Sequence, residues 1–371
     1  MNIAGGNYAQ PPGSGCRHKE EMNKDVFKPE CRSTGIGSLP FTDASEACSL
    51  LLDSVDFPFW PQLPCISFRE QMIPQYAEGL PSVEIDDAAR RVRFILRESS
   101  ADEIAAFFDR HKSGELGSFA ISPEFSKGFA AFAAMAAPRR WPAVKGQITG
   151  PLTYSLSVCD GSGRPACCTF ELLDIIRRLL ARKAQWQVAE LGRYADRVLI
   201  FIDEPALAAF GSTCEANLSR ADMARILNDL IASIHDAGAL AGIHACGSAD
   251  WALLAATQAD IISFDAFDHA RSIAESPDRA AEILQRGGSL AWGIVPTSEA
   301  LAGQTVAGLR SKLFEAFAPL EQHGIPRPLL LERCLLAPSC GAGNLTVTET
   351  RRLFCLLGKL SRSLREEFFP A

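Results

Sequence analysis

Short, almost continuously apolar segments alternate with longer amphipathic segments through most of this chain, and this alternation limits the possible folds more than any other feature. The apolar segments span residues 143–149, 197–205, 239–247, 259–267 and 288–296. Strands that are apolar on both faces are typical of a parallel sheet, because helices cover such a sheet on both sides. We therefore interpret these five segments as buried parallel strands.

The segments between and after these strands have the periodicity of amphipathic helices. They span residues 172–195, 219–236, 248–257, 277–286, 306–323 and 346–365. Strands that alternate with helices at this spacing indicate βαβ units, and no G-x-G-x-x-G sequence follows any of the strands. The pattern predicts an α/β protein with a single TIM (β/α)8 barrel, in preference to two doubly wound halves.

The chain has 371 residues, which is enough for one large barrel. Residues 1–32 are rich in Gly, Pro, Ser and charged residues and have no period, so they are predicted to form a disordered tail. Residues 33–371 are predicted to be the barrel domain, with a hairpin-like insertion near residues 83–96. No second domain is expected.

Charge and hydropathy narrow the class of protein. The formal net charge is −7 and no basic stripe is present, which argues against a nucleic-acid-binding protein. The longest apolar run, 129–137, falls far short of the roughly 18 residues that suggest a membrane span. The N-terminal segment has no apolar signal-peptide core, so the protein is expected to be cytoplasmic. Its twelve cysteines are then expected to be reduced thiols.

Histidine and cysteine side chains lie at the carboxyl ends of the predicted strands, where a barrel carries its reactive groups. His244 and Cys246 are two residues apart, so both side chains point to the same face of an extended segment. Asp265 ends the next strand, and Cys340 follows the apolar run 329–336, which we interpret as the last strand. An imidazole, two thiols and a carboxylate suit a tetrahedral Zn²⁺ site. The alternatives are a core histidine with core cysteines, or a Cys246–Cys340 disulfide.

This set of zinc ligands also indicates a type of reaction. Three firm protein ligands and a weakly held fourth position leave zinc free to bind a water or an incoming thiol. Zinc that already carries two thiolates polarises a carbonyl poorly, but it holds a further thiolate well. The ligands therefore favour alkylation of a substrate sulfur over hydrolysis. Deamination stays an alternative, because thiolate-rich zinc also serves deaminases.

Two further groups at strand ends could bind a substrate. Asp203 follows the strand V-L-I-F-I, where a carboxylate can hold an ammonium group or act as a general base. Gly37 and Ser38, in G-I-G-S-L-P, offer backbone N–H groups and a hydroxyl suited to a carboxylate. The alternatives are an ordinary glycine turn and an acid at a helix N-terminus, which suits Glu204 better than Asp203.

Six segments occur in the order found in cobalamin-independent methionine synthase: TGIGSLPFTD at 34–43, ITGPLTYSL at 148–156, FIDEPAL at 201–207, GIHACG at 242–247, ISFDAF at 262–267 and APSCG at 337–341. From residue 33 onward the chain resembles the C-terminal catalytic half of that family, in the superfamily shared with uroporphyrinogen decarboxylase. The resemblance implies a TIM barrel that binds zinc and methylates homocysteine to methionine. It also implies roles for His244, Cys246 and Cys340 as zinc ligands, Asp203 for the substrate amino group, and the Gly37-Ser38 backbone for its carboxylate.

The sequence departs from the family pattern at several points. Asp265 stands where the family has a Glu, and Ser157 stands where the family has a Trp that stacks on folate. Ile66 stands about where a family Glu helps to hold homocysteine, and Glu70 is nearby without being assigned that role. A chain of this length is not expected to include the second, N-terminal barrel with which the full-length enzymes bind polyglutamylated folate.

These features predict a zinc-dependent methyltransferase that acts on a small-molecule thiol, with homocysteine as the first candidate. Asp265 is expected to be a fourth zinc ligand that the incoming sulfur displaces. The methyl donor is expected to be a corrinoid protein or methyl-folate. Since the chain has no D-x-H-x-x-G sequence, a corrinoid would be carried by a separate partner. The alternatives are a uroporphyrinogen-decarboxylase-like or hydrolytic enzyme without catalytic zinc, and a non-catalytic module that binds a corrinoid protein or zinc.

Overall fold

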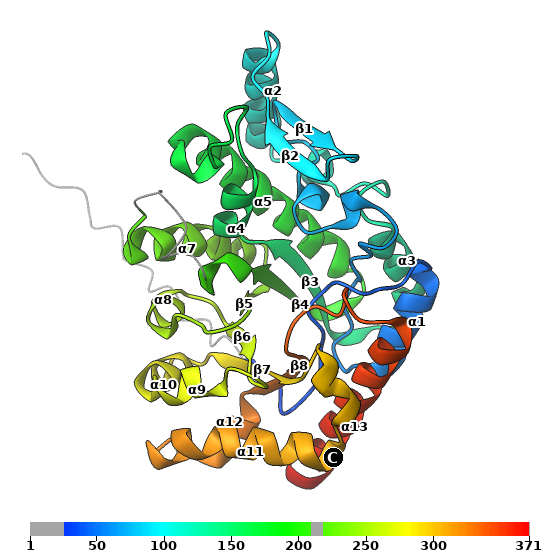
Figure 1. The fold of residues 1–371 in the computed structure, drawn as a ribbon, viewed down its shortest axis with the longest axis vertical. Helices are drawn as coiled ribbons and strands as arrows, with labels where there is room; N and C mark the ends of the chain where they lie inside the picture. Colours follow the sequence, from blue (N-terminus) through cyan, green and yellow to red (C-terminus); the bar gives the residue numbers. More distant parts are fainter. Residues whose placement is uncertain (1–25, 209–217, 371) are drawn as a thin grey trace, which may run out of the picture.

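A curled sheet of six parallel strands forms the centre of the fold (Figure 1). The computed structural model describes residues 26–208 and 218–370. The strands pair in chain order: β3 (Trp141–Thr149), β4 (Ala195–Asp203), β5 (Leu240–Ala245), β6 (Ile261–Asp265), β7 (Ser289–Val295) and β8 (Cys334–Pro338). The five predicted strands are all confirmed, with ends shifted by at most two residues.

Two irregular segments, 31–38 and 57–62, connect the outer strands of this sheet. Leu336 of β8 donates its N–H to the carbonyl of Arg32 (2.8 Å), and Lys145 of β3 donates to Pro58 (2.8 Å). The two segments also bond to each other, since Phe57 N–H donates to Ser33 (2.9 Å). The α/β class and a curled, barrel-like sheet are confirmed, whereas the described residues form six regular parallel strands where eight were predicted. Prolines at 58, 61 and 64 lack N–H groups, which prevents a continuous ladder there.

Side chains alternate between two cores along each strand, because successive residues of a strand point to opposite faces. One set packs beneath the helices in a large outer core. The other set points inward, and it is apolar toward the amino ends of the strands: Phe27, Phe57, Ala143, Leu199, Phe201, Ile261, Ala291 and Leu335. Toward the carboxyl ends the inward positions become polar, as with the buried side chains of Lys145, Gln147, Asp203 and His244. The barrel interior is therefore a packed apolar core at the amino ends of the strands and is lined by polar side chains at the carboxyl ends.

Residues 26–32 pack against the apolar end of the barrel, so the packed part of the chain begins before residue 33. Phe27 is only 8% exposed, and its ring centroid lies 5.9 Å from that of Phe57. The carbonyl of Phe27 accepts hydrogen bonds from Ser289 Oγ and Arg333 Nη1, both at 3.3 Å. Residues 26–32 show no hydropathy period, because they are buried by contact with the end of the barrel and do not form a helix or strand of their own. The rest of the predicted tail, residues 1–25, lies outside the described residues.

We expect Phe27→Ala to lower the free energy of unfolding by about 3 kcal/mol, because it leaves a cavity at the end of the barrel. Val26→Ala is the matched control: Val26 is 43% exposed, and its truncation should cost less than about 0.5 kcal/mol. Urea denaturation followed by circular dichroism measures both. Equal losses for the two variants would show that Phe27 does not contribute to the barrel core.

Helices surround the sheet. The six predicted helices are confirmed, as α5 (Phe170–Leu191), α7 (Arg220–Asp236), α8 (Trp251–Ala256), α10 (Pro277–Gln285), α11 (Val306–Gln322) and α13 (Val347–Phe368). The others are α1 (Ala44–Ser54), α2 (Ser100–Ser113), α3 (Lys127–Ala136), α4 (Pro151–Ser157), α9 (Ala270–Ala274) and α12 (Arg327–Glu332). Short 3₁₀ helices are η1 (Phe68–Glu70), η2 (Pro74–Tyr76), η3 (Leu116–Phe119), η4 (Ala166–Cys168), η5 (Pro205–Ala208) and η6 (Glu299–Gly303). The apolar run 329–336 is not one strand, because its first half belongs to α12.

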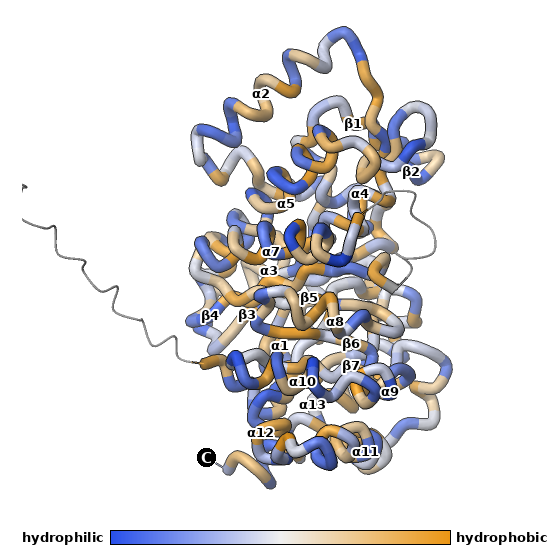
Figure 2. The backbone as a smooth tube through the Cα atoms, turned by 90° about the vertical axis from the view of Figure 1, so that its left-hand side faces the viewer, coloured by the Kyte–Doolittle hydropathy of each residue, from blue (hydrophilic) through white to orange (hydrophobic). Residues whose placement is uncertain are grey.

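The predicted hairpin is present as β1 (Val83–Asp86) and β2 (Arg91–Phe94), which pair antiparallel. It lies with α2 at the top of Figure 1, at the opposite end of the molecule from α11 and α12, and Figure 2 shows α2 alternating between hydrophilic and hydrophobic residues. Phe94 N–H donates to the carbonyl of Cys159 (2.8 Å), which holds the hairpin against the loop after α4.

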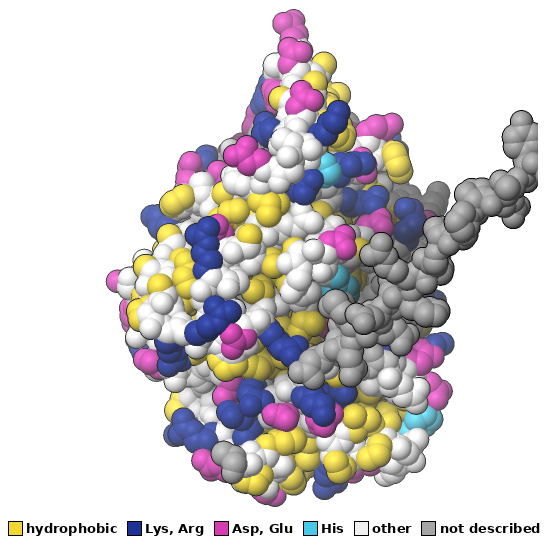
Figure 3. Space-filling view, turned by 180° about the vertical axis from the view of Figure 1, so that it is seen from behind, with side chains coloured by type: hydrophobic (Ala, Val, Ile, Leu, Met, Phe, Trp, Pro, Cys, Tyr) yellow, Lys and Arg dark blue, Asp and Glu magenta, His cyan; other side chains and the backbone are white. Residues whose placement is uncertain are grey.

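The outer surface carries charges of both signs. In Figure 3 Lys and Arg side chains are interspersed with Asp and Glu over the face that the view shows. None of the described helices has both the length and the apolar character that are needed to cross a bilayer.

Candidate metal and substrate site

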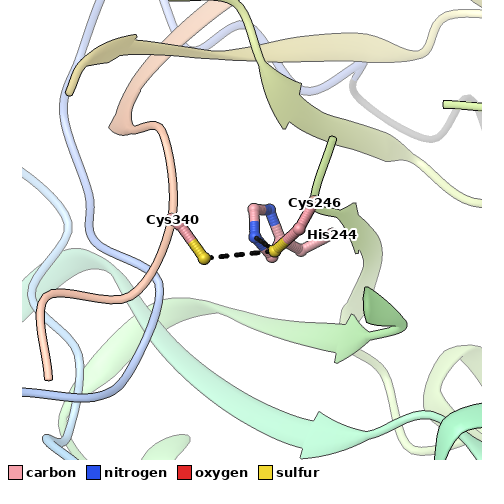
Figure 4. Close-up of side chains that lie close together, drawn as sticks. All are labelled: His244, Cys246 and Cys340. Carbon is pink, nitrogen blue, oxygen red and sulfur yellow. Dashed lines mark hydrogen bonds between the residues drawn. The ribbon is translucent and has the colours of Figure 1, made fainter. Parts of the chain in front are cut away.

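An imidazole and two thiols meet at the carboxyl end of the sheet (Figure 4). His244 lies in β5, Cys246 follows that strand, and Cys340 follows β8. His244 Nε2 lies 3.1 Å from Cys246 Sγ, and Cys246 Sγ lies 3.1 Å from Cys340 Sγ. All three potential ligand atoms lie within 4.8 Å of one another. Three of the four predicted zinc ligands are thus brought together from distant parts of the chain.

The geometry of this cluster fits a zinc ion. Tetrahedral coordination with Zn–S bonds of about 2.3 Å places two sulfur ligands about 3.8 Å apart. From their 3.1 Å contact, the two sulfur atoms need to separate by about 0.7 Å to reach that arrangement, a shift within the range of a side-chain rotation. One nitrogen and two sulfur donors are also the ligand types that zinc prefers over Mg²⁺ or Ca²⁺.

The second ring nitrogen of His244 is held by β6. His244 Nδ1 lies 2.9 Å from Ser263 Oγ, and the two residues are register partners in neighbouring strands. Both side chains are buried. A partner on the far nitrogen fixes the orientation of an imidazole ligand and leaves Nε2 directed at the metal. Ser263 is therefore a site residue that the sequence analysis missed.

The two thiols of the cluster have different acidities. The neighbouring Cys246 thiol, together with His244, lowers the pKa of the Cys340 thiol. The adjacent Cys340 and burial raise the pKa of the Cys246 thiol. Cys340 is thus the first of the pair to ionise, and the thiolate is the form that binds metals. Both are free thiols, and their 3.1 Å separation exceeds the roughly 2.05 Å of a disulfide bond.

Asp265 ends β6 as predicted, but its carboxylate is not part of the cluster. Its Oδ1 accepts hydrogen bonds from the N–H groups of Phe267 and Asp268, both at 2.9 Å. Burial raises the pKa of Asp265. The aspartate therefore caps the backbone of the following turn. In this conformation Asp265 lies outside the cluster of His244, Cys246 and Cys340.

Asp203 lies at the end of β4, directly beside His244 in the sheet register. It is 7% exposed and lines a cavity of about 350 Å³ together with His244, Cys246 and Cys340. Its Oδ1 is buried and has no hydrogen-bond partner among the described residues. Burial raises the pKa of Asp203 to about 6, against the opposing effects of Lys145 and His244. An unpartnered carboxylate oxygen in a cavity suits a cationic group of a ligand.

Glu204, the next residue, has a structural role. Its Oε1 accepts from Leu152 N–H (3.0 Å), while Oε2 accepts from Thr153 N–H (2.8 Å) and Thr153 Oγ (2.6 Å). These contacts cap the first turn of α4. A Cβ on Gly150 would lie 2.1 Å from Glu204 Cδ, so the glycine of I-T-G-P-L-T leaves space for this carboxylate. The D-E-P and T-G-P motifs are therefore two halves of one packing contact.

The Gly37-Ser38 segment borders the same cavity as Asp203. Ser38 lines the cavity, and its N–H and hydroxyl donate no hydrogen bond to other described residues. A Cβ on Gly341 would lie 2.2 Å from Ser38 Oγ, so the glycine after Cys340 lets the serine approach the metal cluster. The structure thus brings the predicted carboxylate-binding segment, Asp203 and the three predicted metal ligands around one cavity.

Two other buried polar residues, Glu70 and Lys145, bond to neighbouring groups of the protein. Glu70 lines the cavity, but its carboxylate accepts the N–H groups of Lys127 (2.7 Å) and Leu63 (3.3 Å). It is therefore committed to the backbone. Lys145 is fully buried inside the barrel, where it contacts the carbonyl of Ile36 and lies 3.2 Å from Gln147 Oε1. Lys145 and Gln147 stand at alternate positions of the apolar strand A-V-K-G-Q. This alternation could have indicated from the sequence that both side chains point to the same face of the strand.

Comparison with known proteins identifies the fold. A solved structure of a B12-independent methionine synthase from Shewanella sp. W3-18-1, in complex with selenomethionine, is similar to this chain with a TM-score of 0.56 and 14% sequence identity. The similarity covers 92% of this chain and 99% of that chain. No family model and no curated protein matches the sequence. This chain therefore shares its barrel-like α/β fold with that B12-independent methionine synthase.

Proposed function

We propose that this protein is a zinc-dependent methyltransferase that transfers a methyl group to the sulfur of homocysteine and forms methionine. The observation that supports this most strongly is the convergence of His244, Cys246 and Cys340 within 4.8 Å at the carboxyl end of the sheet. A cavity that can receive a small molecule opens directly onto these three side chains. The similarity of fold to a B12-independent methionine synthase is in line with this proposal.

A zinc ion held by these residues would keep a bound substrate thiol in its thiolate form, since coordination deprotonates a thiol. The two thiols of the chain suit such a site, because a sulfur-rich zinc leaves the additional thiolate nucleophilic. The third protein ligand, His244, is held in place from behind by Ser263. Asp265 remains our candidate for a fourth, displaceable ligand, provided that its loop releases the carboxylate.

The chain's own residues orient the substrate. We infer that the Asp203 carboxylate accepts a hydrogen bond from the ammonium group of the substrate. The N–H and hydroxyl of Ser38 would bind the carboxylate of the substrate. Asp203 and Ser38 both line the cavity together with His244, Cys246 and Cys340. Fixing the two ends of the amino acid directs its sulfur toward the donor, so that the sulfur–carbon bond forms as the donor–methyl bond breaks and its electron pair stays on the donor. Such positioning can supply a large part of the rate enhancement.

We infer further that the segments 31–38 and 57–62 occupy the positions of the first two strands of a (β/α)8 barrel. The hydrogen bonds to β8 and β3 support this. Ser38 then lies at the carboxyl end of the first strand position, on the side where barrel enzymes carry their active sites.

Methyl transfer to homocysteine is tested directly by incubation of the zinc-loaded protein with either methyl-folate or free methylcobalamin. Mass spectrometry of the product then detects methionine. Methionine from either donor supports the proposal and identifies the donor class, which we predict to be a folate or a corrinoid on a separate protein. Absence of any methylated thiol with both donors would favour a non-catalytic binding module.

The competing assignment is a uroporphyrinogen-decarboxylase-like or hydrolytic enzyme that uses Asp203 as its acid. Removal of metal with a strong chelator separates the two assignments. Thiol methylation should disappear on chelation and return with added zinc. An activity that persists in the metal-free protein would favour the decarboxylase-like assignment.

We expect Ser263→Ala to weaken zinc binding by about 10- to 100-fold, because outer partners of metal-binding histidines typically contribute that much. Competition with a chromogenic chelator measures the affinity. Ser272→Ala, which removes an acceptor for Trp251 Nε1 outside the cluster, is the control and should leave zinc affinity unchanged. Wild-type affinity in Ser263→Ala would mean that the serine does not orient His244.

A further inference from the structure

A fully buried lysine lies inside the barrel, close to the metal and substrate site. Lys145 belongs to β3 and has no exposed surface, and its Nζ lies 4.8 Å from the ring centroid of Phe201 and 5.4 Å from that of Phe59. No described acid forms an ion pair with this lysine. Burial lowers the pKa of Lys145 to about 8, against the attraction of Asp203, so the amine is charged at neutral pH. Because burying a charge is costly, such a residue is expected to have partners that require it.

The side chain and the backbone of Lys145 bond to the two irregular segments of the barrel, 31–38 and 57–62. Its Nζ donates a hydrogen bond to the carbonyl of Ile36, and no other described residue donates to that carbonyl. Its backbone N–H donates to the carbonyl of Pro58 (2.8 Å). One residue of β3 thus holds both segments, where regular strands would be held by a ladder of backbone hydrogen bonds.

The hydrogen bond to Ile36 bears on the orientation of Ser38, two residues further on. A peptide group is planar, so a fixed Ile36 carbonyl also fixes the direction of the Gly37 N–H. Backbone hydrogen bonds hold the rest of this turn: Gln62 N–H donates to the Gly37 carbonyl (3.0 Å), and Leu39 N–H donates to the Gln62 carbonyl (2.9 Å). Of these contacts, the one at Ile36 depends on a charged side chain.

Lys145 acts on the site indirectly. It does not line the cavity of about 350 Å³, whereas Ile36 and Ser38 do. The ammonium group is itself held in place, because it donates to Gln147 Oε1 (3.2 Å) while Gln147 Nε2 donates to the carbonyl of Trp60 (3.0 Å). A fixed positive charge that bonds to a peptide carbonyl polarises the peptide group and favours an anion nearby, since electrostatic interactions are strong in a buried environment.

We propose that Lys145 is a positioning residue for the carboxylate of the substrate: its ammonium group holds the Ile36 carbonyl, which directs Ser38 at the cavity and favours an anion there. This role rests on the proposed function, in which Ser38 binds the substrate carboxylate. It is separate from the role of Asp203, which is proposed to bind the ammonium group of the substrate. Loss of the lysine should therefore weaken the binding of thiols that have a carboxylate and spare thiols that have none.

The test compares three thiols: homocysteine, 4-mercaptobutanoate, which has no ammonium group, and 3-aminopropane-1-thiol, which has no carboxylate. Titration calorimetry measures their binding to the zinc-loaded full chain. Lys145→Met keeps an apolar side chain and removes the charge and the donor. It should weaken the binding of homocysteine and 4-mercaptobutanoate by about 5- to 30-fold, from a lost hydrogen bond that involves a charged group, and change that of 3-aminopropane-1-thiol by less than about twofold. Its zinc content should equal that of the wild type, because Lys145 is not part of the metal cluster.

Lys183→Met is the matched control. Lys183 is also a fully buried lysine, but it lies on α5, where its Nζ donates to the carbonyl of Ala120 (3.2 Å), and it does not line the cavity. This variant should bind all three thiols as the wild type does. Lys145→Gln, which keeps an N–H donor on a shorter side chain, is the second variant. It should show the pattern of Lys145→Met with a smaller loss, and it carries the test if Lys145→Met does not fold.

The outcomes separate this role of Lys145 from the proposed function. Unchanged binding of the two carboxylate thiols in the Lys145 variants, equal losses for all three thiols, or the same losses in Lys183→Met would each overturn the inference and leave the proposed function standing. A zinc-loaded wild-type protein that binds none of the three thiols would contradict the proposed function, and the role of Lys145 with it.

Discussion

Cys340→Ser is expected to reduce the zinc content of the purified protein from about one ion per chain to a small fraction of that value. The serine hydroxyl does not ionise near neutral pH, so it cannot replace a thiolate ligand. Thiol methylation should fall by at least about 100-fold, since even partners outside the coordination shell contribute up to that factor. His244→Ala should have the same two effects. Atomic emission measures the metal, and the methyl-transfer assay measures the rate.

The matched control for this variant is Cys355→Ser. Cys355 is an exposed free thiol on α13, so the same chemical change is made away from the cluster. It should keep both zinc and activity, and both serine variants should show similar thermal unfolding. Full zinc content in Cys340→Ser and His244→Ala would refute the assignment of these residues as ligands.

Asp203→Asn is expected to raise the KM for homocysteine by about 10- to 100-fold, the range for loss of a hydrogen bond to a charged group. The carboxylate is buried, its Oδ1 is unpartnered, and it borders the cavity, so its loss leaves the substrate ammonium group without a counter-charge. The maximal rate should change less than the KM, because the sulfur is bound elsewhere. Steady-state kinetics with varied thiol measures both.

A substrate without an amino group provides the control for this prediction. With 4-mercaptobutanoate, which has the thiol and carboxylate of homocysteine but no ammonium group, the wild type and Asp203→Asn should differ little. This comparison also accounts for any loss of folding caused by removing the negative charge of Asp203 near the buried Lys145, because such a loss would affect both substrates alike. An equal change in KM for the two thiols would show that Asp203 does not bind the amino group.

Much of the fold could be predicted because the strands are apolar on both faces. The last strand was harder to place. Its apolar run, 329–336, continues through the end of α12 into β8, and a short buried helix and a short buried strand have the same hydropathy. The role of Phe27 could not be predicted either, because a residue that fills the end of a barrel has no local pattern.

The candidate site was partly predictable for a similar reason. His244, Cys246 and Cys340 lie at or just after the carboxyl ends of apolar strands, so their position at one end of the barrel could be inferred from the chain alone. Asp265 has the same inward position, but its short side chain bonds to the N–H groups of its own turn, a local competition that strand periodicity does not reveal. Ser263 was missed because its role depends on the register between β5 and β6.

We propose above all that His244, Cys246 and Cys340 together hold a zinc ion that binds the substrate sulfur. X-ray absorption at the zinc edge, with and without homocysteine, tests it most directly. We predict that zinc in the free protein has one nitrogen and two sulfur ligands from these residues, and that it gains one sulfur after homocysteine is added. A coordination shell whose sulfur content does not change on addition of homocysteine, or a protein that binds no zinc, would contradict it.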